Sequence, residues 1–418
     1  MLDQILTRQN IARSLRAGPA REHVDAYVAW LVARQYTRGS MSLYLHALAR
    51  YCVWIDESKR QVGRDEVANL AAFRAHLDTR GLLYGMGRNG KMELRGDVSS
   101  VGTFVGFLVE TGVATPPSRK PTIQEQYPIL AEYAAWIGQH GGVRASSQRV
   151  YLVVLARLVE GVGDDPSTYT TRNVRGFVTK ESGKFGVDRA TTITIATRSY
   201  LRFLVATGRV ARGMEGALMY PANWRLSSVP RYIEPDDVEK AIAVFDPATK
   251  VGARDRAIIL LLARLGLRAG EVAALRMADV DWVGGRLAVA GKGRRQHWLP
   301  LPQEVGDAML AYLLDARPKV PSEFVFLRTL APYRELSMEA VAAVAKKAIR
   351  LSGVKTPSVG SHVFRHSVAT TMLRQGASLA GVGAVLRHRN PGTTAHYAKV
   401  DLGMLGEVAQ PWPEVSPC

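Results

Sequence analysis

The C-terminal part of this 418-residue chain carries short polar segments whose residue types could act together on a phosphodiester. A guanidinium group offers forked hydrogen bonds that stabilise negative charge on phosphate oxygens, as a metal ion would. A tyrosine hydroxyl can attack phosphorus if a neighbour accepts its proton, because a phenol has a pKa of about 10. Five segments supply such groups in chain order: Gly266-Leu-Arg268-Ala-Gly-Glu271, Gly291-Lys292-Gly-Arg-Arg295, His362-Val-Phe-Arg365-His366, Leu386-Arg387-His388, and Tyr397.

The order and spacing of these segments resemble the tyrosine recombinase (phage integrase) family. The resemblance covers residues 231–405 in detail, and it extends loosely to residues 122–215 as the family's helical core-binding domain. It implies that Arg268 and Arg365 clamp the scissile phosphate, where negative charge builds on the equatorial oxygens. It also implies that Tyr397 is the nucleophile.

The same resemblance implies roles for four further side chains. His362 acts as a base or positions the phosphate, and His388 occupies a position where the family has His or Trp that donates a hydrogen bond to a phosphate oxygen. Lys292, at a hairpin tip, is the general acid that protonates the departing 5′ oxygen. Glu271 orients the site, although it could equally be a surface charge on a helix. Each residue alone has an ordinary structural alternative, and their combination favours catalysis.

The sequence departs from the family at one position of these segments. Many members read Leu-Gly-His where this chain reads Leu386-Arg387-His388, so the added bulk changes how the turn approaches DNA. Neither a metal nor ATP is expected as a cofactor. His362 and His366 lack the H-E-x-x-H spacing of a zinc site, and Gly291-Lys-Gly is not a nucleotide-binding loop. A phosphotyrosyl bond keeps the energy of the broken diester, so rejoining needs no other source.

Composition points to a polyanionic partner. Lys and Arg total 55 against 37 Asp and Glu, a formal net charge of +18, which makes nucleic acid the expected partner. The family resemblance implies that this partner is double-stranded DNA with specific recombination sites. The two cysteines, Cys52 and Cys418, are too few for a disulfide framework. We see no apolar run of about 20 residues that would span a bilayer and no signal peptide at the N-terminus. A cytoplasmic, nucleoid-associated protein with no membrane partner is therefore expected.

Two proline-rich stretches, 115–121 and 220–230, divide the chain into packed units. We predict an N-terminal helical module at 1–115, a helical DNA-clamping domain at 122–215, a catalytic domain at 231–405 and a tail at 406–418. Three segments of the first unit recur in the second in the same order, which indicates duplication. The alternative is two unrelated helical bundles. The matched pairs are 26–31 with 132–137, 44–50 with 151–157, and 107–113 with 203–208.

The apolar pattern predicts a mostly α chain, with a mixed α/β catalytic domain that contains a small antiparallel sheet. Helices are expected at 148–159, 254–265, 337–350, 363–374 and 379–386, with another beginning at Gly270 and running towards Arg276. Ser146 and Ser147 are N-cap candidates for the first of these helices. Strands at 286–290 and 296–301 form a hairpin. The glycine-rich stretch 81–96 is expected to be a mobile loop or an arm that reaches a DNA groove.

Several basic and hydroxyl side chains are candidates for DNA contact. Those on helix faces of the second unit are Arg144, Arg149, Thr191, Thr192 and Arg198, and those at the hairpin tip are Arg294 and Arg295. Where the catalytic domain passes into the tail, Leu402, Leu405 and Val408 recur at three-residue steps. This apolar edge packs on its own domain or, as the resemblance implies, docks on a neighbouring protomer in a dimer or tetramer on DNA.

We therefore expect a site-specific recombinase or integrase of a mobile element that cleaves DNA through a 3′-phosphotyrosyl intermediate and exchanges strands, as in transposition. Sister recombinases or accessory proteins are further expected partners. One alternative is a relaxing enzyme similar to type IB topoisomerases, which the tail and the tandem modules disfavour. The other is a non-catalytic DNA-binding protein derived from a recombinase, which the full set of catalytic residue types disfavours.

Overall fold

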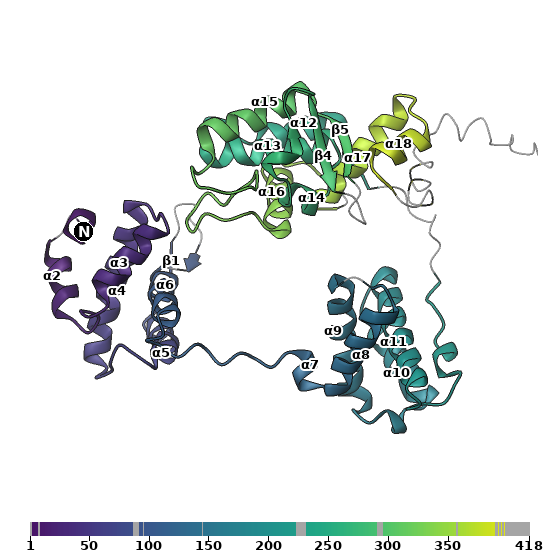
Figure 1. The fold of residues 1–418 in the computed structure, drawn as a ribbon, viewed down its shortest axis with the longest axis horizontal. Helices are drawn as coiled ribbons and strands as arrows, with labels where there is room; N and C mark the ends of the chain where they lie inside the picture. The colour runs from purple at the N-terminus through teal and green to yellow at the C-terminus, as the bar shows by residue number, and fades with distance from the viewer. Residues whose placement is uncertain are drawn as a thin grey trace, which may run out of the picture. The chain divides into compact units, whose positions relative to one another are not determined.

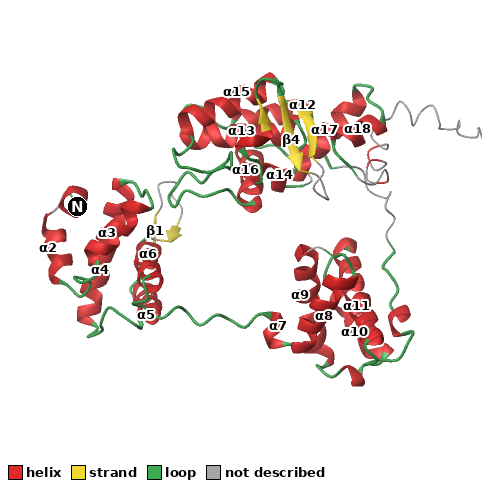
Figure 2. Cartoon of the chain, viewed as in Figure 1, coloured by secondary structure: helices red, strands yellow, loops and turns green. Residues whose placement is uncertain are grey.

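The computed structural model in Figure 1 describes residues 2–6, 9–86, 92–94, 96–143, 145–222, 231–290, 296–356 and 358–388, with Gly392, Thr394 and Tyr397. Within them the protein is mostly helical, with one two-stranded and one three-stranded antiparallel sheet (Figure 2). The predicted fold class, mostly α with a small antiparallel sheet, is confirmed. No helix in these ranges is long and apolar enough to cross a membrane.

The chain divides into two compact units, Pro117–Ser227 and the combination of Met1–Pro116 with Ser228–Cys418. Three large hydrophobic cores form within residues 2–114, 130–218 and 233–364. Each core is built from one stretch of sequence. The predicted boundaries of three domains and a tail stay a prediction.

The first core is built by helices, and a short hairpin lies in the same stretch of the chain. The helices are α1 (Leu2–Ile5), α2 (Gln9–Ala17), α3 (Val24–Ala33), α4 (Arg38–Glu57), α5 (Glu66–Thr79) and α6 (Asp97–Glu110). The expectation of a mobile loop at 81–96 is wrong, because β1 (Tyr84–Met86) pairs antiparallel with β2 (Met92–Leu94). The alternative, an arm that reaches a DNA groove, stays a prediction. The glycines did not prevent pairing because each strand needs only three residues, and the glycines that fall between the strands lie outside the described residues.

The second core is built entirely by helices. They are α7 (Ile123–Gln126), α8 (Pro128–His140), α9 (Ala145–Val162), η1 (Pro166–Thr168), α10 (Thr171–Ser182), α11 (Val187–Ala206) and η2 (Met214–Ala217). Ser146 and Ser147 were predicted as N-caps of α9, and this is wrong. Because the helix already begins at Ala145, both serines lie in its first turn.

Matching aromatic contacts occur in the two helical cores. In the first core the ring of Tyr27 meets Phe104 edge-on at 5.1 Å, and Trp30 meets Phe107 at 5.9 Å. In the second core Tyr133 meets Tyr200 edge-on at 5.5 Å, and Trp136 meets Phe203 at 5.8 Å. Corresponding residues of the two cores are separated by 106 positions in the first member of each pair and by 96 in the second. These are the same offsets as in the sequence matches. These contacts support the duplication, which stays a prediction.

The third core surrounds α13 (Lys250–Arg264), whose Ile258–Leu262 stretch is fully buried. The other helices are α12 (Pro235–Ala243), α14 (Ala269–Ala273), η3 (Met277–Asp279), α15 (Gln303–Ala311), η4 (Tyr312–Ala316), α16 (Met338–Ser352), α17 (Ser361–Arg374) and α18 (Leu379–Val385). The predicted helix from Gly270 towards Arg276 is shorter than expected. It ends at Ala273, because Arg276 pairs instead with Phe324 in an isolated β-bridge.

The predicted hairpin is present as β4 (Arg286–Ala290) and β5 (Gln296–Pro300), and the short β3 (Val280–Asp281) joins β4 on its other side. Leu287 pairs with Leu299, and both side chains are buried in the third core. Ala288 pairs with Trp298, whose side chain is exposed. The hairpin tip that carries Lys292, Arg294 and Arg295 lies outside the described residues.

Candidate active site

The position of Arg268 is set by the turn between α13 and α14. Gly266 adopts a positive φ of 58°, and a Cβ at this position would lie only 2.8 Å from the Cδ2 atom of Leu386, so only glycine fits without displacement. Arg268 follows and caps α14. Its backbone N–H donates to Glu271 Oε2 at 2.9 Å, and its guanidinium donates to Glu271 Oε1 at 2.7 Å. The Arg268 side chain remains 41% exposed, so it can still reach a substrate.

Helix α17 carries His362, Arg365 and His366 within two turns. Arg365 is 4% exposed. Its guanidinium donates to the carbonyl of Gly266 at 2.5 Å and to the carbonyl of Leu386. The second arginine thereby ties together the turn before α14 and the turn after α18. Burial and the nearby charge of Arg268 lower the pKa of Arg365 to about 10, so the group is still cationic at neutral pH.

Tyr397 lies in a small hydrophobic cluster formed by α17 and α18, and it is 2% exposed. Its hydroxyl lies 2.7 Å from Nδ1 of His366. Its ring stacks parallel to the imidazole of His388, with ring centres 6.2 Å apart. Burial raises the pKa of Tyr397, and the charges of Arg365 and Arg268 oppose this rise. The hydroxyl is therefore protonated at neutral pH and sits in the field of both guanidinium groups.

The two histidines predicted for the site are both held in the neutral form. Burial, followed by the charges of Arg365 and Arg268, lowers the pKa of His362. The same causes, in the same order, lower the pKa of His388 to about 4. Nδ1 of His388 lies 2.9 Å from the hydroxyl of Thr394. If Thr394 donates this hydrogen bond, the neutral ring carries its proton on Nε2 and can donate it to a phosphate oxygen.

Comparisons with known proteins show the family of this chain. A model of the phage integrase family matches residues 231–403. XerD of Listeria innocua is 30% identical over 56% of this chain and 80% of its own length. The chain belongs to the phage integrase family, the tyrosine recombinases.

Other members of the family are similar over different shares of the chain. The Sinorhizobium fredii protein y4rA, which is named as an integrase/recombinase, is 44% identical over 58% of this chain. The match covers only 59% of the length of y4rA. A second protein of that organism with the same kind of name, y4rF, is 28% identical over 99% of this chain and 96% of its own. The solved structure of XerH bound to its difH substrate has a TM-score of 0.55 at 15% identity, and the match covers 70% of this chain and 97% of that one.

Five of the predicted site residues lie, with Tyr397, in the part of the chain that the structure describes, and the structure brings all five together around Tyr397. They are Arg268, Glu271, His362, Arg365 and His388. Lys292 lies outside the described residues. Among the described residues, three lie in the site without a predicted role there. His366 contacts the tyrosine hydroxyl, Arg387 binds Glu271, and Thr394 contacts His388. The sequence signals of the first two were a second histidine one helical turn after His362 and an arginine where many members have glycine.

The predicted DNA-contacting residues of the second module differ in their surroundings. Arg149 is exposed on α9. Thr191 and Thr192 are half-buried, and each hydroxyl donates to a carbonyl one turn earlier in α11. Arg198 donates to the carbonyl of Leu218 at 2.9 Å, so it already holds a neighbouring segment of its own domain. Arg144, like Arg294 and Arg295, lies outside the described residues.

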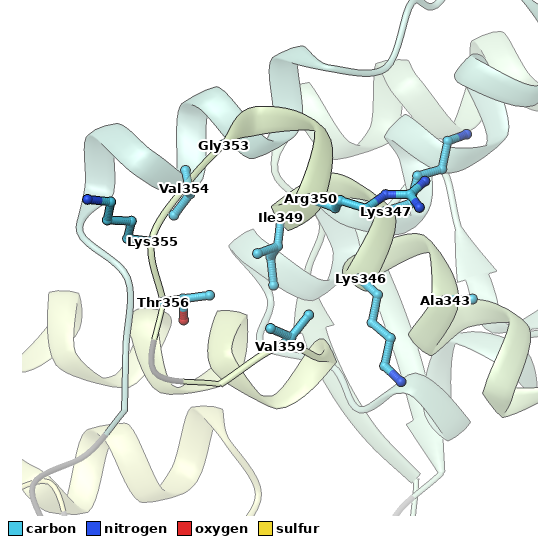
Figure 3. A pocket seen from close by; sticks show the side chains of 10 residues that line it. All are labelled: Ala343, Lys346, Lys347, Ile349, Arg350, Gly353, Val354, Lys355, Thr356 and Val359. Atoms are coloured by element: carbon cyan, nitrogen blue, oxygen red, sulfur yellow. The ribbon is translucent and has the colours of Figure 1, made fainter. Parts of the chain in front are cut away.

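A hollow of about 710 Å³ opens beside the C-terminal half of α16. In Figure 3, Ile349, Val354 and Val359 surround it, whereas Lys346 and Lys355 point away from it on either side. The hollow therefore has an apolar interior and a basic rim. This combination suits an amphipathic segment with acidic residues.

Proposed function

We propose that this protein is a site-specific recombinase of a mobile element that cleaves and rejoins DNA through a 3′-phosphotyrosyl bond at Tyr397. The observation that carries the proposal is the convergence of two guanidinium groups on one buried phenol, which is hydrogen-bonded to a histidine. Arg268 and Arg365 supply the positive charge that a phosphoryl-transfer transition state requires. The proposed reaction uses neither a metal ion nor ATP.

Cleavage is a transesterification in which the tyrosine oxygen attacks phosphorus in line with the 5′ oxygen. The bond from phosphorus to the tyrosine oxygen forms as the bond to the 5′ oxygen breaks. The phenolic proton passes to a histidine, and Lys292 gives a proton to the departing 5′ oxygen. Attack by the 5′ hydroxyl of another strand reverses these steps and completes strand exchange, and the number of diester bonds is unchanged.

The geometry favours His366 over His362 as the acceptor of the phenolic proton. Nδ1 of His366 is within hydrogen-bond distance of the Tyr397 hydroxyl. His362 has a lowered pKa and stays neutral beside the two arginines, so it can donate a hydrogen bond to the phosphate. We therefore assign proton acceptance to His366, and we assign phosphate positioning to His362 and His388.

DNA is the proposed partner, and assembly on DNA is part of the proposal. The net charge of +18 favours binding to a polyanion. Similar structures include XerH bound to difH, and also a tetramer of lambda integrase bound to a Holliday junction, with a TM-score of 0.52. We propose that this chain binds specific recombination sites as a dimer or tetramer, with sister recombinases or accessory proteins as further partners.

The tail of a second copy is the proposed occupant of the hollow beside α16. The sequence that leads from Asp401 into the tail combines apolar Leu402 and Leu405 with acidic Asp401, Glu407 and Glu414. The apolar side chains match the interior of the hollow, and the acidic ones match its basic rim. Val354→Asp should weaken assembly on DNA, measured by light scattering, and circular dichroism checks that the monomer stays folded, because Val354 also packs against the third core. The same change at Val251, an exposed valine of α13, is the control.

A nicked duplex that traps the covalent intermediate tests the central proposal. The DNA is found by footprinting the protein on the sequence that flanks its own coding region. We expect a protein–DNA adduct that survives denaturation, forms in the presence of EDTA and is lost in Tyr397→Phe, while DNA binding persists. Relaxation of a plasmid without recombination between two sites would favour a topoisomerase-like activity. Absence of the adduct on a duplex that the protein footprints would contradict catalysis.

A further inference from the structure

Arg387 occupies a position in the turn after α18 where an arginine is unexpected. Its φ is +55°, a left-handed conformation that favours glycine, and many family members have glycine here. The side chain is 3% exposed. A long cationic side chain at a strained backbone position, buried beside other arginines, requires a compensating interaction.

The compensating interaction is an ion pair with Glu271. Arg387 donates from Nη2 to Glu271 Oε2 at 2.7 Å and from Nη1 to the carbonyl of Val385 at 3.2 Å. Its Nε is buried and makes no hydrogen bond within the described part of the chain. The guanidinium thus points into the protein, and its two terminal nitrogens are already bound. This placement does not suit direct contact with a DNA phosphate.

Glu271 is shared between two arginines. One oxygen binds the guanidinium of Arg268, and the other binds the backbone N–H of Arg268 and the guanidinium of Arg387. Burial raises the pKa of Glu271, but these hydrogen bonds and the charge of Arg387 outweigh it, so the carboxyl is ionised. Without Arg387 this carboxylate, 13% exposed, would keep only one cationic partner.

The turn that carries Arg387 contacts the catalytic groups on both sides. The carbonyl of Leu386 accepts a hydrogen bond from Arg365. His388, the next residue, stacks on the ring of Tyr397. Arg387 adds the remaining connection, through Glu271 to Arg268. One three-residue turn is therefore linked to both arginines of the phosphate clamp and to the nucleophile.

We propose that Arg387 is a positioning residue that fixes the guanidinium of Arg268 through Glu271. It holds the phosphate clamp in its catalytic geometry before DNA binds, a task that glycine at this position cannot perform. The inference rests on the proposed function, since the reaction that reports it is DNA cleavage. A rival role, in which Arg387 binds a phosphate directly, predicts a loss of DNA affinity instead of a loss of rate.

The test compares Arg387→Gly with a matched control. Lys59 is also a basic residue at positive φ, 52°, but it is exposed in the first module, so Lys59→Gly makes the same kind of backbone change and also removes one positive charge. With nicked duplex and saturating protein, we expect Arg387→Gly to cleave about 10- to 100-fold more slowly, because small misplacements of a catalytic group have effects of this size. DNA affinity should change less than about threefold, and Lys59→Gly should match the wild type.

Two further variants separate positioning from folding. Arg387→Lys keeps a cation that can pair with Glu271, so it should recover part of the rate. In a double-mutant cycle, Arg387→Gly combined with Glu271→Gln should be no slower than Glu271→Gln alone, since both act through one interaction. Cleavage by Arg387→Gly at the wild-type rate, additive effects in the cycle, or a large loss of affinity at unchanged saturated rate would overturn the proposal.

Hydrogen exchange supplies a measurement that needs no DNA. The backbone N–H of Arg268 donates to Glu271. The backbone amide hydrogens of the peptide that spans Gly266–Glu271 should therefore exchange faster in Arg387→Gly than in the wild type. In Lys59→Gly their exchange rate should be unchanged. Unchanged exchange in Arg387→Gly would contradict the inference even if the enzyme is active. If the wild type forms no adduct but exchange rises in Arg387→Gly, the proposed catalysis fails while the positioning contact stands.

Discussion

At the scale of single residues, the site separates the roles of its ionisable groups by burial and charge. The arginines stay cationic because even the buried Arg365 has a pKa of about 10. The same positive charge lowers the pKa values of His362 and His388, so both are neutral hydrogen-bonding groups. The phenol of Tyr397 stays protonated until a base acts. In the proposed reaction, phosphoryl transfer at neutral pH would therefore depend on the contact between Tyr397 and His366.

Replacement of His366 by Gln should slow cleavage about 10²- to 10⁴-fold, the range typical of a lost general base. The glutamine can still hydrogen-bond the hydroxyl but cannot accept its proton at neutral pH. The measurement is single-turnover adduct formation between pH 6 and 9, where the rate of the variant should rise with pH as the small ionised fraction of the phenol grows. His140→Gln, on an exposed position of α8, is the control. A variant that cleaves as fast as the wild type would show that the hydrogen bond is only structural.

His388 should make stability depend on pH in a defined window. Its pKa is about 4 in the folded protein against 6.5 ordinarily, because burial and the charges of Arg365 and Arg268 disfavour its protonation. Between these values the unfolded chain binds more protons, so the free energy of unfolding should fall as pH drops from 6.5 to 4. Calorimetric melting temperatures should show a shallower fall in His388→Gln. An equal slope in wild type and variant would contradict the assignment.

At the scale of elements, the site depends on close approach between the end of α13 and the end of α18. Gly266 lies against Leu386, and Arg365 binds the carbonyls of both residues. No single helix holds the clamp. It forms where two turns and one face of α17 meet, so changes that separate the turns should impair it without touching a catalytic group.

Gly266→Ala should lower the free energy of unfolding by about 2–4 kcal/mol, because it combines a left-handed φ with a clash against Leu386. Gly285→Ala is the matched control: its φ of 57° is nearly the same, but nothing lies within 4 Å of the added methyl. The control should lose only the backbone cost, about 1–2 kcal/mol. Denaturant titration gives both values, and equal losses would show that the close approach is unimportant.

The catalytic elements could be predicted from sequence because their signals are local. The hairpin strands, α16, α17 and α18 follow from apolar period and turn residues, and the spacing of the arginines, histidines and tyrosine matched a family pattern. The contact of His366 with Tyr397 could not be predicted, since it joins residues 31 positions apart through tertiary packing. The burial of the Arg387 side chain could not be predicted either. It depends on tertiary packing, and the local sequence around a buried arginine does not differ from that around an exposed one.

At the scale of the whole molecule, positive charge is spread over a chain of several helical cores. The basic residues on the helices that form these cores differ in how accessible they are to DNA. Arg149 on α9 is exposed, whereas Arg198 on α11 is bound to the carbonyl of Leu218 and lies 4.9 Å from the ring centre of Tyr220. The sequence predicts that both arginines lie on helix faces. Arg149 can bind a phosphate directly, whereas Arg198 would first have to break its contacts inside its own domain.

DNA binding should therefore depend steeply on salt, and individual arginines should contribute unequally. If six to ten phosphates are neutralised, affinity for duplex DNA should fall about 10³- to 10⁵-fold between 50 and 200 mM salt, since each neutralised phosphate adds about 0.9 to the slope. Arg149→Ala should reduce that slope by about one. Arg198→Ala should leave the slope unchanged and lower the melting temperature, because its contacts are internal. Fluorescence anisotropy over a salt series measures the slopes. The opposite result, in which the salt slope is shallower for Arg198→Ala and unchanged for Arg149→Ala, would contradict this prediction. It would mean that DNA binding reorganises α11 and its neighbouring segment.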